Sequence, residues 1–306
     1  LTMINGKMFD FLNLSGGENM KNRNVDNISI RGYSHLLSNK ECQDHSMSWE
    51  GVICPKYVPG RPPKGKPYYG VIVCDGHGGE KYFRSAVGSK IACQVGRTCI
   101  EHVMKKITLT PNNYKRHLDY LENEIVKTWR NAVLSDFAKN PFDQDINFDS
   151  LSEESKESLI KNPIKAYGST FIAAVMTNTY YFVLKLGDGN VNIINYDGNA
   201  SLLKSVDDTQ LEFNLTTSLC QTNAVNEFRH IYVTIDNDMP IKGIVLTTDG
   251  IINSYTSEQA YLDFMGNIFS GYKEETLESA HAELKEFLPR LSEKGSGDDL
   301  TVGIIF

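Results

Sequence analysis

The chain has 306 residues and a formal net charge of −7, and 41% of its residues are hydrophobic and 23% charged. This size and composition predict a globular protein with a substantial core, built as one large domain or two small ones. The acidic balance argues against a nucleic-acid partner, which selects a basic surface. No apolar stretch approaches the roughly 20 residues needed to cross a bilayer, so no membrane span is expected.

The six cysteines are thinly spread and include no Cys-x-x-Cys pair. Disulfide frameworks are concentrated in short secreted chains. The first residues, Leu1–Lys7, also lack the basic-then-apolar order of a secretion signal. We therefore predict reduced structural thiols and a cytoplasmic location.

The N-terminal part of the chain divides into an arm and the start of a folded domain. Residues 1–27 are rich in Asn and Gly without a clear period and are expected to form a flexible arm, whereas residues 28–306 are expected to form a single domain. Short β-like runs occupy residues 28–49. A basic loop rich in Pro and Gly follows at residues 55–67, and the apolar run at residues 68–74 predicts a buried strand.

The middle of the chain changes to helical patterns. Helices are expected over residues 80–106 and 114–139, the second because its apolar residues form a single stripe. Residues 141–165 are an acidic, Ser-rich insertion between two prolines. This insertion is expected to be a solvated connection with one short helix, for which Ser152 and Ser155 are candidate caps.

The last part of the chain returns to strands and ends on two helices and a strand. Strands are expected at residues 169–175, 180–186, 191–196, 231–235, 244–247 and 300–306, and helices near 257–269 and 275–288. Strands in two runs with helices between and after them favour an α+β domain with packed sheets and flanking helices. A doubly wound parallel sheet fits worse, because several strands are joined by turns of hairpin length.

The most informative segment is Asp75-Gly76-His77-Gly78-Gly79, which follows a buried strand directly. A carboxylate at the edge of a core is costly unless it is paired or binds a cation. The glycines allow a sharp turn and a close approach of the backbone to an ion or a phosphate. The alternative interpretation is a polar turn closed by glycine.

The same pattern recurs at other strand ends. Asp188 and Asp249 each follow a predicted strand within a short Gly-containing turn, and Asp298 and Asp299 precede the last strand. Each junction alone is typical of a turn. If these carboxylates cluster, however, their mutual repulsion requires cations.

The ligand types select the metal. Carboxylates, a backbone carbonyl and waters suit Mg²⁺ or Mn²⁺, whereas the His and Cys clusters expected for zinc are missing from the sequence. Two such ions can activate a water and neutralise a phosphoryl group during in-line attack. A nearby His can donate a proton to the leaving oxygen, so the pattern points to phosphomonoester hydrolysis.

The order of these motifs resembles that of the metal-dependent protein phosphatases of type 2C, the PPM family, in a style close to its bacterial branch. The resemblance covers roughly residues 28–306 and is most specific at the block that begins with Asp75. Four blocks carry it in the family's order: Cys42-Gln43-Asp44, Asp75-Gly76-His77-Gly78-Gly79, Thr248-Asp249-Gly250 and Gly297-Asp298-Asp299-Leu300-Thr301-Val302.

The resemblance implies an antiparallel β-sandwich flanked by helices on both faces, with two Mg²⁺ or Mn²⁺ ions at one end. By position, Asp75 would bridge both ions and the Gly76 carbonyl would bind one of them. Asp249 and Asp298 would hold the other ion, and Asp188 would help to hold a third, weaker ion.

The remaining carried-over roles concern proton transfer and the phosphate. His77 would be the general acid, and Asp44 would either lie behind the metal ligands or bind metal through water. Many members have a Glu where this chain has Gln43, and a phosphate-binding Arg where it has Asn39. Lys40 or His35 is a candidate replacement for that Arg, although Lys cannot form the two parallel hydrogen bonds of an Arg. Asp299 stands where the family has Asn and is expected to lie behind the metal ligands.

Two functional hypotheses follow from this resemblance. The first is a Mg²⁺- or Mn²⁺-dependent signalling phosphatase that removes phosphate from phosphoserine or phosphothreonine in proteins, with a metal-activated water as nucleophile. The alternative is a catalytically weak or silent phosphatase-like module that binds a phosphoprotein or regulatory partner. Residues 199–230 are a candidate flap for substrate selection, and the histidines outside the motifs, such as His230, are expected to be structural.

Overall fold

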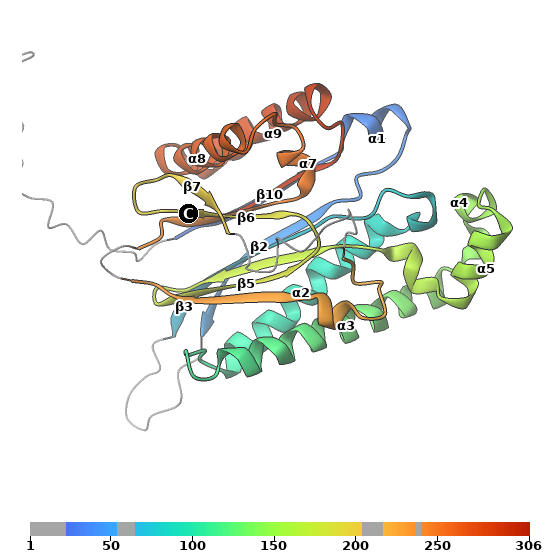
Figure 1. Ribbon diagram of the computed structural model, residues 1–306, viewed down its shortest axis with the longest axis horizontal. Helices are drawn as coiled ribbons and strands as arrows, with labels where there is room; N and C mark the ends of the chain where they lie inside the picture. Colours follow the sequence, from blue (N-terminus) through green and yellow to red (C-terminus); the bar gives the residue numbers. More distant parts are fainter. Residues whose placement is uncertain (1–22, 54–64, 204–216, 237–239) are drawn as a thin grey trace, which may run out of the picture.

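The computed structural model describes residues 23–53, 65–203, 217–236 and 240–306. Two five-stranded antiparallel sheets pack face to face, and helices cover both outer faces, as the sequence predicts (Figure 1). In spatial order the first sheet contains β1 (Val25–Ile30), β10 (Leu300–Ile305), β9 (Gly243–Thr247), β6 (Asn190–Ile194) and β7 (Ala200–Leu202). The second contains β2 (His45–Ile53), β3 (Lys66–Cys74), β4 (Phe171–Met176), β5 (Tyr180–Leu186) and β8 (Arg229–Thr234).

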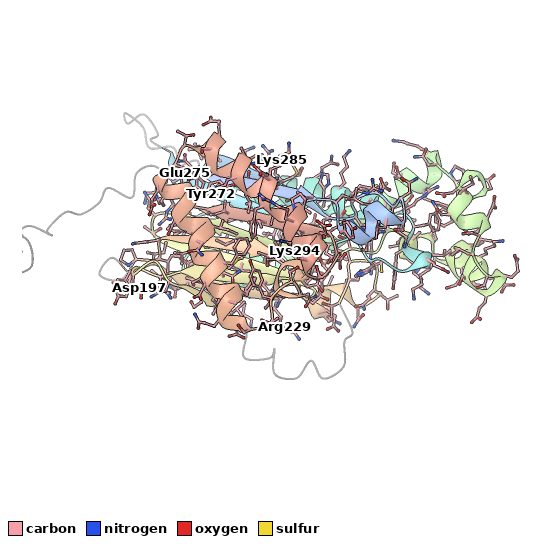
Figure 2. All side chains as sticks on the ribbon, turned by 90° about the horizontal axis from the view of Figure 1, so that it is seen from above. Asp197, Arg229, Tyr272, Glu275, Lys285 and Lys294 are labelled. Carbon is pink, nitrogen blue, oxygen red and sulfur yellow. The ribbon has the colours of Figure 1, made fainter. Side chains whose placement is uncertain are left out.

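Two long helices cover each sheet. Helices α2 (Ser85–Lys106) and α3 (Tyr114–Lys139) lie on the second sheet, and α8 (Glu258–Glu274) and α9 (Leu277–Lys294) lie side by side on the first, as seen from above in Figure 2. The apolar side chains form three core layers, one between the sheets and one under each helix pair. None of the helices in the described ranges is both long and apolar enough to span a bilayer.

The apolar stripe predicted for residues 114–139 is the buried face of α3. Its apolar residues are buried against α2 and the second sheet, and the indole Nε1 of Trp129 donates to the Gly88 carbonyl at 3.0 Å. A Cβ at Gly88 would lie 1.9 Å from the carbonyl oxygen of Tyr167. Glycine is therefore required for the close approach of α2 to the segment that precedes β4.

The insertion after α3 holds more helix than predicted. It contains α4 (Ile146–Asp149), α5 (Glu153–Lys161) and the 3-10 turns η2 (Phe142–Gln144) and η3 (Pro163–Tyr167). The Ser152 hydroxyl accepts from the Ser155 backbone N–H and caps α5, so the expected Ser155 cap is wrong. The short elements α4 and α5 form because local caps compensate for a weak apolar pattern.

Other boundaries also differ from the prediction. β1 begins at Val25, inside the range expected to be an arm, because its partner β10 supplies the hydrogen bonds. The predicted helix start at residue 80 is the 3-10 turn η1 (Glu80–Tyr82), and the sequence analysis missed α1 (Tyr33–Leu37), β7, α6 (Ala224–Glu227) and α7 (Asp249–Ile252). Most of the predicted arm, most of the loop at 55–67 and residues 204–216 of the flap candidate lie outside the described residues. The five cysteines within the described ranges are free thiols.

Candidate metal centre

The antiparallel register gathers the predicted carboxylates at one end of the sandwich. β3 ends beside the start of β2, β9 ends beside the start of β10, and β5 ends beside the start of β4. Asp75, Asp188 and Asp249 follow strand ends, whereas Asp44 and Asp298 precede strand starts. The short helices α1 and α7 lie at this same end, opposite the C-terminus (Figure 1).

Three of these carboxylates meet directly. One oxygen from each of Asp75, Asp188 and Asp249 lies within 4.8 Å of the others. The Asp75 backbone is held by Thr170, whose hydroxyl accepts from the Asp75 N–H at 2.9 Å and whose N–H donates to the Asp75 carbonyl at 2.8 Å. The Asp249 carboxylate accepts from the Asn253 side chain at 3.0 Å, one turn along the chain. The ligand atoms are thus positioned by rigid elements.

Within the described residues, neither Asp75 nor Asp249 forms an ion pair with a Lys, Arg or His side chain. Burial raises the pKa of Asp75 well above its ordinary value, and the charges of Asp44, Asp249, Asp298 and Asp188 raise it further. Burial and the charge of Asp188 likewise raise the pKa of Asp249, and burial raises that of Asp298. A site with only oxygen donors and excess negative charge fits a hard divalent cation.

Asp44 lies behind this cluster and joins the two sheets. Its Oδ2 atom accepts hydrogen bonds from the hydroxyls of Thr248 and Thr301, both at 2.8 Å. Burial, followed by the charge of Asp299, raises the pKa of Asp44. The sequence analysis quoted both threonines as motif residues but missed this function, which a Thr before the Asp-Gly turn could have signalled.

Gly76 is needed for close packing at the centre. A Cβ at this position would lie 2.5 Å from the backbone carbonyl oxygen of Gln43. Among the residues that the structure describes, none donates a hydrogen bond to the Gly76 carbonyl. A buried carbonyl without a donor suits the predicted metal-ligand role.

His77 lies next to the carboxylates, in a partly buried position. Its backbone N–H donates to the Gly168 carbonyl at 3.2 Å, and its ring packs edge-on against Tyr82 with the centroids 4.9 Å apart. Burial lowers the pKa of His77; the charge of Asp188 raises it and that of Lys81 lowers it. The ring is thus held by packing beside the cluster.

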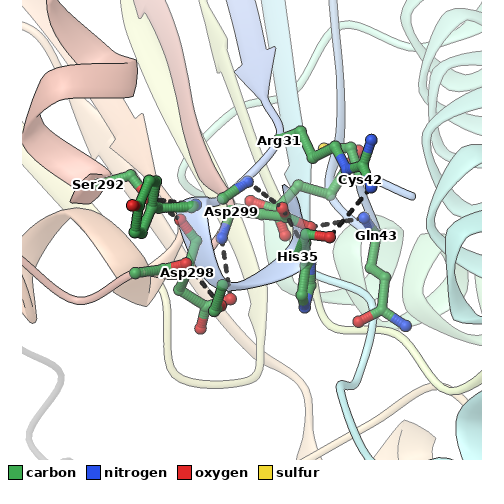
Figure 3. A network of polar contacts seen from close by, with 12 residues as sticks. Arg31, His35, Cys42, Gln43, Ser292, Asp298 and Asp299 are labelled. Carbon is green, nitrogen blue, oxygen red and sulfur yellow. Dashed lines mark hydrogen bonds and ion pairs between the residues drawn. The ribbon is translucent and has the colours of Figure 1, made fainter. Parts of the chain in front are cut away.

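Asp299 organises the loop that precedes β2 (Figure 3). Its Oδ1 accepts from the Gly32 N–H at 2.6 Å and pairs with Nδ1 of His35 at 2.9 Å, and its Oδ2 accepts from the Gln43 N–H at 2.6 Å. Burial favours the neutral acid, but the bonds from His35, Gly32 and Gln43 hold the pKa of Asp299 below its ordinary value. The sequence analysis did not foresee the His35 pair.

The predicted phosphate-side residues occupy different environments. Lys40 is exposed, and its backbone N–H donates to the His35 carbonyl at 2.9 Å. The Gln43 side chain donates to the Ser85 hydroxyl at 2.7 Å. Because Nδ1 of His35 forms a hydrogen bond with the Asp299 carboxylate, that atom is not available to bind a phosphate. Asn39 has a left-handed backbone with φ of 54° at the end of α1.

A second group of metal-ligand residues lies away from this centre, on α3 and β8. One ligand atom from each of Asp119, Glu122 and His230 lies within 4.8 Å of the others. His230 Nδ1 is 2.8 Å from the buried Glu122 carboxylate and 3.8 Å from that of Asp119. The hydrogen bond with Glu122 raises the pKa of His230.

Comparisons with known proteins place the chain in a family. Residues 31–289 match the family described as protein phosphatase 2C. The chain belongs to this family. A search of curated proteins found no match.

Solved structures share the fold of this 2C-family chain at low sequence identity. A bacterial serine phosphatase is 13% identical, with a TM-score of 0.55 over 93% of this chain and 97% of that one. The serine/threonine phosphatase Stp1 of Staphylococcus aureus is 12% identical, with a TM-score of 0.54 over 92% and 93%. The catalytic domain of the phosphatase PstP, in complex with two manganese ions, is 14% identical, with a TM-score of 0.50 over 92% and 97%.

Proposed function

We propose that this protein is a Mg²⁺- or Mn²⁺-dependent phosphatase that removes phosphate from phosphoserine or phosphothreonine in proteins. The observation that carries the proposal is the cluster of Asp75, Asp188 and Asp249, whose ligand atoms lie within 4.8 Å of one another. Membership of the 2C family and the two manganese ions of the PstP complex support it.

The donor set suits two hard cations. Asp75, the Gly76 carbonyl, Asp249 and Asp298 would be the metal ligands. Asp188 would contribute to a third, weaker site, and Asp44 would act through a bound water. When bound, the ions would supply an activated water and neutralise charge on the phosphoryl group.

The other residues position the substrate and move a proton. His77, held beside the cluster by Tyr82 and Gly168, would donate a proton to the leaving oxygen. Asp299 holds the loop that carries Gln43, so that loop is placed before a phosphate arrives. Lys40, exposed near this loop, is available to a phosphate oxygen.

A metal titration tests the proposal. The protein is stripped of metal with a chelator, and hydrolysis of an aryl phosphate and a phosphothreonine peptide is followed as Mn²⁺ or Mg²⁺ is added. We expect turnover only with the divalent ion and its loss on renewed chelation. No stimulation by either ion, together with retained binding of the phosphopeptide, would instead support the silent binding module.

A further inference from the structure

A basic groove lies beside His77. It has a volume of about 440 Å³ and is lined by η1, the end of the insertion and residues 220–223. Tyr82 belongs to both regions, because its ring lines the groove and packs against His77 with the centroids 4.9 Å apart. A side chain of a substrate peptide that binds in this groove would therefore lie close to the phosphorylated residue of the same peptide at the metal centre.

Two lysines give the groove its charge. Lys81 and Lys165 line it, and no Asp or Glu is among its lining residues. The Lys165 ammonium donates to the Ser158 hydroxyl at 3.2 Å, and the Lys81 ammonium lies 5.0 Å from the Tyr82 ring centroid. Within the described residues, neither lysine forms an ion pair with a carboxylate. In a chain with a net charge of −7, this is a local excess of positive charge.

The two charges act on the same place. Cys220, which is 8% exposed, lines the same groove as the two lysines. Burial raises the pKa of the Cys220 thiol, whereas the hydrogen bond with Ser218 and, to a smaller extent, the charges of Lys81 and Lys165 lower it. Because Lys81 and Lys165 line the same groove, both ammonium groups can act on one anionic group bound in it.

The insertion holds Lys165 in place. Arg84 donates to the Tyr167 hydroxyl at 2.9 Å, and that hydroxyl donates to the Asp136 carboxylate at 2.7 Å. The Arg84 N–H also donates to the Ala166 carbonyl at 3.0 Å, next to Lys165. These bonds tie η3 to the start of α2 and the end of α3, so the backbone that carries Lys165 is fixed before a ligand binds.

We infer that the Lys81–Lys165 groove binds an anionic side chain that flanks the phosphorylated residue of the substrate. The inference rests on the proposed function and adds a substrate class, namely acidic or multiply phosphorylated peptides. A carboxylate and a second phosphate share the chemistry that two lysines recognise. The insertion at residues 141–165 then serves specificity, because it carries Lys165.

The test compares phosphothreonine peptides that differ only in one flanking residue, at one to four positions on either side. The residue is Ala, Glu, phosphoserine or Lys, and kcat/KM is measured with Mn²⁺ beside that for an aryl phosphate. We expect the anionic peptides to be preferred over the Ala peptide by about fivefold to tenfold at the best position. The Glu and phosphoserine arms identify which anion is favoured.

Variants assign the preference to the groove. Lys81→Gln combined with Lys165→Gln should bring the anionic-to-Ala ratio close to one, and Lys165→Glu should favour the Lys peptide. Lys165→Glu should leave aryl phosphate hydrolysis and the melting temperature near those of the wild type. The double variant is judged by its peptide ratio alone, because the charge of Lys81 also acts on His77. Lys285→Gln, on α9 across the molecule (Figure 2), is the matched control and should change none of these values.

Each result has a defined meaning. A wild type that prefers neutral or basic peptides, or double variants that keep the anionic preference, would overturn the groove assignment. Failure of the proposed function would show separately, as wild-type aryl phosphate hydrolysis that no metal stimulates.

Discussion

Two regions of this molecule each bring three potential metal-ligand atoms within 4.8 Å of one another, yet the charges around them differ. In the group on α3 and β8, Nδ1 of His230 lies 2.8 Å from the Glu122 carboxylate, and this contact raises the pKa of His230. In the centre around Asp75, burial and four neighbouring carboxylates raise the pKa of an acid. The comparison teaches that closeness of ligand atoms does not define a metal site. An excess of neighbouring carboxylates, such as that around Asp75, is what favours a bound cation.

The largest effect should come from removing one carboxylate of the centre. Asp75→Asn keeps the shape but removes the central negative ligand, so we expect kcat/KM for an aryl phosphate to fall by about 10³-fold or more. Since the pKa of Asp75 is raised, its charge is disfavoured in the metal-free fold. The metal-free variant should therefore melt a few degrees higher than the metal-free wild type, as about 1 kcal/mol implies.

Asp119→Asn is the matched control in the other group. Mn²⁺ should raise the melting temperature of the wild type and of Asp119→Asn equally, and that of Asp75→Asn much less. Full activity in Asp75→Asn, or loss of the Mn²⁺ shift in Asp119→Asn, would reverse the assignment of the two groups.

Much of the centre could be predicted because motif and topology act together. Asp75, Asp188 and Asp249 each follow an apolar strand, and antiparallel pairing then places strand ends beside strand starts. Likewise, the apolar stripe of residues 114–139 predicts α3 with its observed ends. In both cases the local pattern and the tertiary packing favour the same structure.

The missed features depend on distant contacts. His35 pairs with Asp299 across 264 positions of sequence, and nothing near His35 signals this partner. The threonine clamp on Asp44 also joins three separate segments. The short helices α1, α6 and α7 have too few residues for a period of 3.6 to be recognised.

A smaller effect should separate the histidines of the two regions. His77→Ala removes the proposed proton donor, so hydrolysis of a phosphothreonine peptide should fall by about 10²-fold. An aryl phosphate has a better leaving group that needs less protonation, and its hydrolysis should fall much less. The measurement is the ratio of the two losses at saturating Mn²⁺. Equal losses would argue against proton donation, and a similar ratio in His230→Gln would show a general structural cause.

The smallest effect on activity, and a specific effect on stability, should come from His230→Gln. The folded-state pKa of His230 is raised, so its stabilisation is fully present below the unfolded value of about 6.5 and is lost as pH rises through the folded value. The variant should lower the free energy of unfolding by about 1.5–3 kcal/mol at pH 6. Denaturant titrations should show a smaller difference from the wild type at pH 9.

Glu122→Gln removes the other partner of this ion pair and serves as its companion variant. It should lose the same pH-dependent part of the stability, because the pair then has no carboxylate. Metal-stimulated activity should be unchanged in both variants, since His230 already pairs with the Glu122 carboxylate and the group lies outside the Asp75 cluster. If either variant instead lost its Mn²⁺-dependent rise in melting temperature, the group on α3 and β8 would itself bind the ion, and charge balance would not distinguish the two regions.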